Sequence, residues 1–532
     1  MSKAETLDIV IVGAGFAGLY MLHKARQQGL RAVVLEAGDD VGGAWYWSRY
    51  PGLRCDVESV QYSYSFSEEI QQEWEWSERY STQGEILRYL QFVAGRLDLH
   101  RDICFGRRVE SAQWHDERRI WSLSTTAGET YQGRYCVLAT GAISTVQLPD
   151  IPGVENFAGE TYHTGGWPED GVSVSGKRVA VIGTGSSGIQ IVPEMAREAA
   201  SLHLFQRTPP YVLEARNAPL DPAHVAEWKG NYAARRLKAR MEPAGIYYDR
   251  VENRSALEPG EEERRAELQR CWDFGGALIL ATYNDVLMTH EANEVVASFI
   301  REKIAETVKD PELVRKLMPS FPLGAKRPPI GSNYYATFNQ PHVSVVDLRE
   351  TPIERVRPEG IETSEGLIPL DVIVYATGYD AITGAIGRIA ITGTDGQRLA
   401  DKWAEGPRTH LGLMCHGFPN LFLVTGPGSP SVLSNVVVSI EQHIEWIADC
   451  LAALADWGAT RIEPELAAED RWVDHVSEVA NMTLYPSVDS WYVGANVPGK
   501  PRMFALYAGG VGEYRRIATE IAADGYRGFT IA

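Results

Sequence analysis

Two glycine-rich fingerprints, one beginning at Gly13 and the other at Gly183, constrain this chain more than any other feature. Each follows a short apolar run and precedes a stretch with helical apolar spacing, as a strand, a tight turn and a helix would. The 532 residues are too many for one core and fit two to four domains. The sequence therefore predicts an α/β fold with two Rossmann-like dinucleotide-binding domains.

Composition divides the chain further. The apolar strands at 135–141 and 372–378 both end in Ala-Thr-Gly, where we expect the chain to cross between domains. Residues 220–319 are rich in helix formers and charged runs, which predicts a helical insertion, and the Pro- and Gly-rich residues 326–341 predict a loop. We therefore expect a domain with the Gly13 fingerprint from residues 1–140 and 386–532, a domain with the Gly183 fingerprint from 151–210 and 333–380, and an insertion over 211–332.

The first fingerprint predicts a site for FAD. Gly13 permits the tight turn, Gly15 lets the backbone approach a pyrophosphate, and Gly18 lets helix and strand pack closely. Glu36 ends the next strand, where its carboxylate can accept hydrogen bonds from ribose hydroxyls and would repel a 2′-phosphate. The alternative is an ordinary glycine turn with Glu36 at the surface. The predicted FAD residues are Gly13, Gly15, Phe16, Ala17, Gly18, Glu36, Gly43, Trp45, Asp56 and Tyr62.

The second fingerprint predicts a site for NADPH. Its second strand ends in Arg207, not in an acid, and a guanidinium can pair with a 2′-phosphate. Lys326 or Arg327 can add a second cation, and the alternative for Arg207 is a solvated surface arginine. The predicted NADP residues are Gly183, Thr184, Gly185, Ser186, Ser187, Gly188, Gln190, Arg207, Thr208, Lys326, Arg327 and Trp491.

Charge and cysteine content exclude several function classes. A formal charge of −19 disfavours nucleic acid and anionic membranes as partners, and the sequence implies no protein partner. The six cysteines form no CxxC pair, which argues against a zinc site, a disulfide framework and a dithiol redox centre beside the flavin. No stretch is apolar enough to span a membrane, and no signal peptide is evident, so we expect a cytoplasmic enzyme. Without a dithiol, oxygen is the expected electron acceptor.

Two longer motifs resemble those of the Baeyer–Villiger monooxygenases. Residues 157–168 match the family fingerprint through Phe157, Gly159, His163, Trp167 and Pro168. Residues 43–56 match the second signature of the family, from Gly43 and Trp45 to Asp56. The Lys-Arg-Pro at 326–328 and the segment 491–502 also resemble the family, and the resemblance covers almost the whole chain. Residues 56–69 and 426–435 look most like the phenylacetone and steroid monooxygenase branch.

The resemblance implies a reaction and the residues that carry it. A type I enzyme of this family uses FAD, NADPH and O₂ to convert ketones to esters or lactones through an anionic C4a-peroxyflavin. Arg327 matches the catalytic arginine of the family. An arginine is needed there because a fixed cation stabilises the anionic peroxide and the adduct. Asp56 matches the carboxylate that orients it. The alternative is a purely structural Arg–Asp pair.

The remaining candidates have roles that the resemblance only outlines. His163 is expected in a linker between the nucleotide domains, where it would couple them and take no direct part in catalysis. Trp491 is expected to contact NADP⁺ and substrate on a loop, residues 485–502, that acts as a lid; otherwise it is a core tryptophan. Ser431, Val432 and Leu433 are expected to border the substrate pocket.

Two other functions remain open at this point. A related flavin monooxygenase could oxidise mainly sulfur or nitrogen, chemistry that does not require Arg327. A non-catalytic flavoprotein or NADPH sensor is disfavoured by the presence of Asp56, Arg327 and both long motifs.

Overall fold

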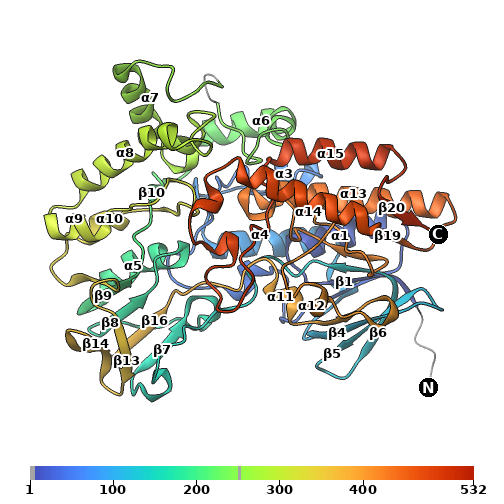
Figure 1. The fold of residues 1–532 in the computed structure, drawn as a ribbon, viewed down its shortest axis with the longest axis horizontal. Helices are drawn as coiled ribbons and strands as arrows, with labels where there is room; N and C mark the ends of the chain where they lie inside the picture. Colours follow the sequence, from blue (N-terminus) through green and yellow to red (C-terminus); the bar gives the residue numbers. More distant parts are fainter. Residues whose placement is uncertain (1–5, 250–252) are drawn as a thin grey trace.

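The computed structural model describes residues 6–249 and 253–532; residues 1–5 of the predicted FAD domain and 250–252 of the predicted insertion lie outside the described residues. Within the described parts, two main sheets lie side by side, and a group of helices from the middle of the chain stands above one of them (Figure 1). Segments from the beginning and the end of the chain together build the larger sheet.

The larger sheet has eight strands, in the order β17-β4-β5-β6-β1-β2-β3 with β18 paired to β6. Strand β1 lies between β2 and β6 and is parallel to both. The strands are β1 (Leu7–Val12), β2 (Ala32–Leu35), β3 (Ile103–Cys104), β4 (Val109–His115), β5 (Ile120–Thr125), β6 (Thr130–Leu138), β17 (Ala390–Thr392) and β18 (Leu421–Leu423). The apolar residues Ile9–Ile11 of β1 are completely buried, as expected for a central parallel strand.

Helices cover this sheet. The first helix, α1, packs against the long helix α13, most of which is buried. The helices here are α1 (Phe16–Gln27), α2 (Ala44–Trp47), α3 (Glu68–Glu73), α4 (Gln83–Arg96), α11 (Gly384–Gly387), α12 (Leu399–Lys402), α13 (Val436–Asp456), α14 (Leu466–Asn481) and α15 (Val511–Ala523). Strands β19 (Ile462–Pro464) and β20 (Phe529–Ile531) pair beside them and fix the C-terminus.

The second main sheet has five strands, all parallel, in the order β12-β9-β8-β16-β7. The strands are β7 (Glu160–His163), β8 (Arg178–Ile182), β9 (Ser201–Gln206), β12 (Val343–Asp347) and β16 (Val372–Tyr375), and helix α5 (Ser186–Glu198) follows β8. A small antiparallel sheet of β13 (Ile353–Arg357), β14 (Gly360–Thr363) and β15 (Gly366–Pro369) lies between β12 and β16 in the chain.

The middle of the chain is largely helical, as its composition predicts. It holds α6 (Pro222–Ala239), α7 (Glu261–Phe274), α8 (His290–Thr307) and α9 (Pro311–Leu317), drawn in green and yellow in Figure 1. Helix α7 begins with three glutamates, which favour the positive end of the helix dipole. The loop prediction for 326–341 was incomplete: these residues include strand β11 (Ile330–Gly331), which pairs with β10 (Leu213–Glu214), and helix α10 (Tyr334–Thr337).

The two connections between the main sheets run beside each other. Strand β6 is followed by Ala139-Thr140-Gly141, and β16 by Ala376-Thr377-Gly378. The N–H of Gln147 donates to the carbonyl of Gly378 at 3.0 Å, and the Thr377 hydroxyl donates to the carbonyl of Gln147 at 2.6 Å. Val146 and Tyr379 form an antiparallel bridge. The segments that carry the Ala-Thr-Gly motifs therefore form one paired crossing.

No helix in residues 6–249 and 253–532 is long and apolar enough to cross a membrane. The six cysteines are all free, and five of them are buried.

Candidate active site

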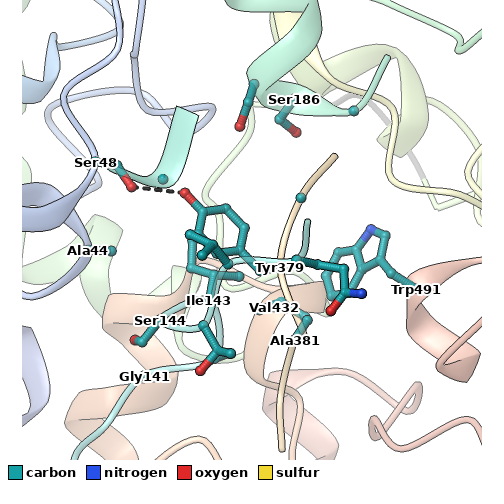
Figure 2. Close-up of a pocket in the computed structure, with 18 of the residues that line it drawn as sticks. Ala44, Ser48, Gly141, Ile143, Ser144, Ser186, Tyr379, Ala381, Val432 and Trp491 are labelled. Atoms are coloured by element: carbon teal, nitrogen blue, oxygen red, sulfur yellow. Dashed lines mark hydrogen bonds between the residues drawn. The ribbon is translucent and has the colours of Figure 1, made fainter. Parts of the chain in front are cut away.

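One large cavity of about 1670 Å³ connects the two glycine-rich fingerprints. Residues that follow strands of both main sheets line it, and Figure 2 shows part of its wall, with Ser48, Tyr379 and Trp491 around the same space. Most of the predicted cofactor residues line it. Gly18 and Gly188 do not, since they serve the packing of helix against strand.

At the first fingerprint, the backbone forms a cradle that only glycine permits. Gly13 has φ +103°, and a Cβ there would lie 2.6 Å from the carbonyl oxygen of Ala139. Helix α1 begins immediately afterwards, and its N-cap residue, Gly15, offers no side chain to the free N–H groups of the first turn. These N–H groups suit the phosphates of a dinucleotide.

Glu36 lies at the end of β2 beside this cradle and is only 4% exposed. Its two carboxylate oxygens accept hydrogen bonds from the N–H of Ala14 and the N–H of Gly38, each at 2.7 Å. The carboxylate is therefore fixed in place, and its remaining lone pairs can accept ribose hydroxyls. The residues of this end fit the FAD that the sequence predicts.

Aromatic side chains form the wall next to the cradle. The Trp45 indole N–H donates to the Tyr62 hydroxyl at 3.2 Å, and the Tyr62 ring meets the edge of Phe16 at 5.4 Å between centroids. Burial raises the pKa of Tyr62 well above its ordinary value, so this phenol stays neutral. The wall is suited to a large flat ring system.

At the second fingerprint, the cradle has the same backbone but is more open. Gly183 has φ +112°, and a Cβ there would collide with the carbonyl of Ala376. A Cβ at Gly185, by contrast, would meet nothing within 4 Å. Helix α5 begins at Ser186, again with no side-chain cap. Ser187 and Gln190 of this helix line the cavity. The Tyr50 hydroxyl donates a hydrogen bond to the side-chain Oε1 of Gln190 at 2.7 Å.

Two cations gather at the open end of the second site. Arg207 is exposed at the end of β9, and Lys326 lines the same cavity near enough to feel its charge. Burial lowers the pKa of Lys326, and the neighbouring positive charge of Arg207 lowers it further, while Asp489 acts in the opposite direction. Two cations that repel each other gain most from an anion between them, so this arrangement fits a 2′-phosphate.

Arg327 and Asp56 lie between the two sites. The guanidinium donates from Nε and Nη2 to the same carboxylate oxygen of Asp56, at 2.9 and 2.6 Å, and from Nη1 to the carbonyl oxygen of Val432. Burial opposes the positive charge, but Asp56 and the neighbouring Tyr492 outweigh it and raise the pKa of Arg327 above its ordinary value. The cavity thus contains a permanent, oriented cation.

The fingerprint residues lie behind the cavity, not in it. The prediction that His163 lies in a linker was wrong, because it ends strand β7, where it pairs with Tyr375 of β16. Its Nδ1 accepts the N–H of Gly165 at 2.9 Å, and its Nε2 lies 3.4 Å from the Thr377 hydroxyl at the paired crossing. Burial lowers the pKa of His163, so the ring is neutral at pH 7.

The other fingerprint residues pack. Phe157 contributes to a core cluster on one face of the five-stranded sheet, and Trp167 is 4% exposed in another. A Cβ at Gly159 would collide with the carbonyl of Asp371. Pro168 follows Trp167 and accepts the N–H of Gly171 at 3.2 Å. This set stabilises the edge of the sheet beside the crossing.

Trp491 lies on the predicted lid and lines the cavity, in the short 3₁₀-helix Trp491–Val493. The residue after it, Tyr492, is 3% exposed and lies beside Arg327, whose positive charge lowers a phenol pKa that burial raises. Sequence reasoning missed Tyr492, although its position next to Trp491 was the available signal. It also missed Ser48 and Tyr379, although Ser48 lies within the recognised motif at 43–56 and Tyr379 directly follows the Ala-Thr-Gly motif at 376–378.

The three residues predicted at the substrate pocket differ in their positions. Val432 lines the cavity and accepts the hydrogen bond from Arg327. Ser431 is completely buried in a left-handed conformation (φ 38°), and Leu433 packs against the cluster that includes Tyr492 and Phe504. The structure thus brings only Val432 of the three to the cavity surface.

Comparisons with known proteins agree with this geometry. Residues 10–239 match the family described as pyridine nucleotide-disulphide oxidoreductase, although all six cysteines here are free. The chain is 40% identical to an acetone monooxygenase (methyl acetate-forming) of Gordonia sp. (strain TY-5), over all of both chains. It is 39% identical to a Baeyer–Villiger monooxygenase of Pseudooceanicola batsensis, over 98% of this chain and 95% of the relative. A phenazine N-monooxygenase of Lysobacter antibioticus is 38% identical over 98% and 97%.

Solved structures give the same result. A steroid monooxygenase bound to NADP is 47% identical, covers 99% of both chains and has a TM-score of 0.95. A complex of OTEMO with FAD and NADP is 38% identical, covers 100% of both chains and also has a TM-score of 0.95. With full-length relatives at this identity, two cofactor cradles and both long motifs, the chain belongs to the Baeyer–Villiger monooxygenases, a family of FAD-containing, NADPH-dependent oxidoreductases.

Proposed function

We propose that Arg327, held by Asp56, is the catalytic cation with which this enzyme converts a ketone to an ester or lactone. The overall balance is ketone + NADPH + H⁺ + O₂ → ester + NADP⁺ + H₂O. When bound, FAD supplies the redox chemistry, since it accepts hydride from NADPH and activates O₂. One observation carries the proposal: a half-buried, oriented guanidinium lies where the two nucleotide sites share a cavity.

An arginine suits this position for a physical reason. Attack on a ketone carbonyl places negative charge on oxygen, and a preorganised cation stabilises that charge without reorganising. The two hydrogen bonds to Asp56 fix the plane of the guanidinium and compensate part of its desolvation. The bond to the carbonyl of Val432 connects the same group to the loop that borders the cavity.

The residues of the two cradles would hold the cofactors. Glu36 would accept the ribose hydroxyls of FAD, and the N–H groups at the start of α1 would bind its phosphates. Arg207 and Lys326 would bind the 2′-phosphate of NADPH, and Trp491 would cover the nicotinamide end. His163 would maintain the crossing and take no part in proton transfer, since its imidazole is hydrogen-bonded on the protein side.

The wall around Arg327 supports an apolar ketone. Val57, Val432, Val436 and Ile440 line the same cavity as Arg327, and so do Cys55 and Tyr62. Apolar surface of this kind binds hydrocarbon rings and chains, while Arg327 addresses the carbonyl oxygen. The 47% identity to a steroid monooxygenase supports aromatic and polycyclic ketones as the first compounds to test.

The test is NADPH consumption across a panel of ketones, with mass spectrometry for a product that is heavier by one oxygen. In Arg327→Ala, we expect ester formation to fall by about 10²–10³-fold, while flavin reduction by NADPH persists. Arg54 lines the same cavity and is paired with Glu78 at 2.7 Å. Arg54→Ala is therefore the matched control and should keep most of the ester formation. Unchanged ester formation in Arg327→Ala would refute the assignment.

A second candidate function is oxidation of nitrogen or sulfur, and the relationship to a phenazine N-monooxygenase favours testing it. Heteroatom oxidation uses an electrophilic oxygen and builds no anion that Arg327 must stabilise. If this were the main activity, Arg327→Ala would spare N- or S-oxidation, and no ketone in the panel would increase NADPH consumption.

The free state of all six cysteines supports a cytoplasmic location. Cell fractionation, with activity recovered alongside cytoplasmic NADPH-dependent enzymes, would test it.

A further inference from the structure

The predicted lid, residues 485–502, covers the cavity with very little regular structure. Only two single turns of 3₁₀-helix, Tyr485–Ser487 and Trp491–Val493, lie within it. Six residues of the lid line the cavity: Asp489, Ser490, Trp491, Ala495, Asn496 and Pro498. The backbone hydrogen bonds within this loop connect residues that are close in sequence, such as Val497 and Lys500, so its position over the cavity depends on contacts with other segments.

Two side chains of the lid supply such contacts. The Lys500 ammonium donates to the Asp380 carboxylate at 2.6 Å and to the carbonyl of Ala381 at 2.9 Å. The Asn496 amide donates to the carbonyl of Tyr379 at 2.8 Å. All three acceptors belong to residues 379–381, which we call the anchor segment.

Lys500 also connects the anchor segment to the turn that bears Trp491. Gly494 ends that turn in the left-handed region (φ 73°), and its N–H donates to the carbonyl of Trp491. A Cβ at Gly494 would lie 3.3 Å from the aliphatic stem of Lys500, so the stem crosses directly over this turn. The Lys500–Asp380 pair is partly shielded, with side-chain exposures of 20% and 27%.

The anchor segment is itself fixed to both halves of the molecule. The hydroxyl of Tyr379 lies 3.0 Å from that of Ser48, a bond that Figure 2 shows across the cavity. The N–H of Asp380 donates to the carbonyl of Thr145 at 2.8 Å. The ring of His163 meets the Tyr379 ring edge-on, 6.3 Å between centroids. The segment therefore contacts the FAD side, the crossing and the fingerprint at once.

We propose that Lys500 is a positioning residue that, with Asn496, latches the lid to the anchor segment and so holds Trp491 over the bound coenzyme. The inference rests on the proposed function of the cavity. Without the latch, the lid opens and admits water, and part of the NADPH is consumed unproductively, as NADPH + H⁺ + O₂ → NADP⁺ + H₂O₂. The latch therefore controls how much NADPH yields ester.

The experiment compares Lys500→Met, Lys500→Arg and a control, Arg502→Met, in the FAD-loaded enzyme. Arg502 is a neighbouring cation, 56% exposed, whose nearest acid is the exposed Asp489 at 4.0 Å. In Lys500→Met, we expect NADP⁺ to bind about tenfold more weakly by calorimetry, since a charge-assisted hydrogen bond is lost. Hydrogen–deuterium exchange over 485–502 should accelerate, and the fraction of NADPH that ends as H₂O₂ should rise severalfold.

Lys500→Arg keeps the charge and should retain most of the coupling, and Arg502→Met should match the native enzyme. If Lys500→Met does not fold, Asp380→Asn removes the same ion pair and carries the same expectations. Native exchange, native NADP⁺ affinity and native coupling in the folded variant would overturn the latch. Failure of the proposed function would show differently, as unchanged ester formation in Arg327→Ala.

Discussion

Both nucleotide sites consist of a glycine turn followed by the start of a helix, but they differ in how closely their residues are packed and how much of them is exposed. At the first, Glu36 is buried with both oxygens engaged, and Gly15 and Gly43 pack so closely that a Cβ at Gly15 would lie 3.3 Å from Gly43 Cα. At the second, Gly185 faces open space and Arg207 is exposed. The first site is preformed for a resident cofactor. The second is suited to a coenzyme that enters, leaves and needs a lid.

The largest expected effect comes from the glycines. In Gly13→Ala, the Cβ would lie 2.6 Å from a backbone carbonyl in a conformation that L-residues avoid, so we expect loss of FAD and of activity. Gly185→Ala makes the same chemical change where space is free; it should keep FAD and raise only the KM for NADPH. Flavin absorbance and NADPH kinetics measure both. Equal FAD loss in the two variants would contradict the comparison.

The next effect concerns Arg207. In Arg207→Ala, kcat/KM for NADPH should fall by about 10–100-fold, because a charge-assisted contact with the phosphate is lost, whereas kcat/KM for NADH should not change. Arg197→Ala is the control, since that arginine is 67% exposed and far along α5. An equal fall for both coenzymes would show that Arg207 does not read the 2′-phosphate.

A buried histidine makes the FAD side sensitive to acid. His443 of α13 is completely buried and accepts the N–H of Thr425, and burial lowers its pKa to about 3. The unfolded chain binds a proton below pH 6.5 and the folded chain does not. The contribution of His443 to the free energy of unfolding should therefore decrease by about 1.4 kcal/mol per pH unit as pH falls below 6.5, in addition to that of other buried histidines such as His410.

Denaturant unfolding at pH 7.0, 6.0 and 5.0 measures this slope. His443→Gln should be less stable at pH 7 but should lose less stability on acidification. A variant with the native slope would exclude His443 as its source.

The smallest effect is a pH dependence at the open site. Because burial and Arg207 lower the pKa of Lys326, this ammonium loses its charge at a lower pH than a free lysine. Phosphate binding favours the charged form, so the KM for NADPH should rise a few-fold on the alkaline side. Lys326→Arg should remove the rise. An identical alkaline profile in this variant would assign the rise to another group.

What could be predicted from sequence is what depends on local spacing. The spacing of apolar residues predicts the strand–turn–helix units, and the position at the end of the second strand of each unit identifies Glu36 and Arg207. The family motifs identify Arg327 and Asp56. Contacts between distant segments could not be predicted. Ser431 is neighbour to a cavity residue yet buried, because its backbone turns into the left-handed region. The Tyr379–Ser48 bond and the approach of Tyr492 to Arg327 join segments that only tertiary packing brings together.

The paired crossing has a mechanical consequence. The two connecting segments are joined by the bridge between Val146 and Tyr379 and by hydrogen bonds of Gln147 and Thr377. They therefore form one reinforced connection between the two halves. We expect these contacts to limit how the two nucleotide halves can move relative to each other. Because the anchor segment begins at this crossing, any such movement would also displace the lid.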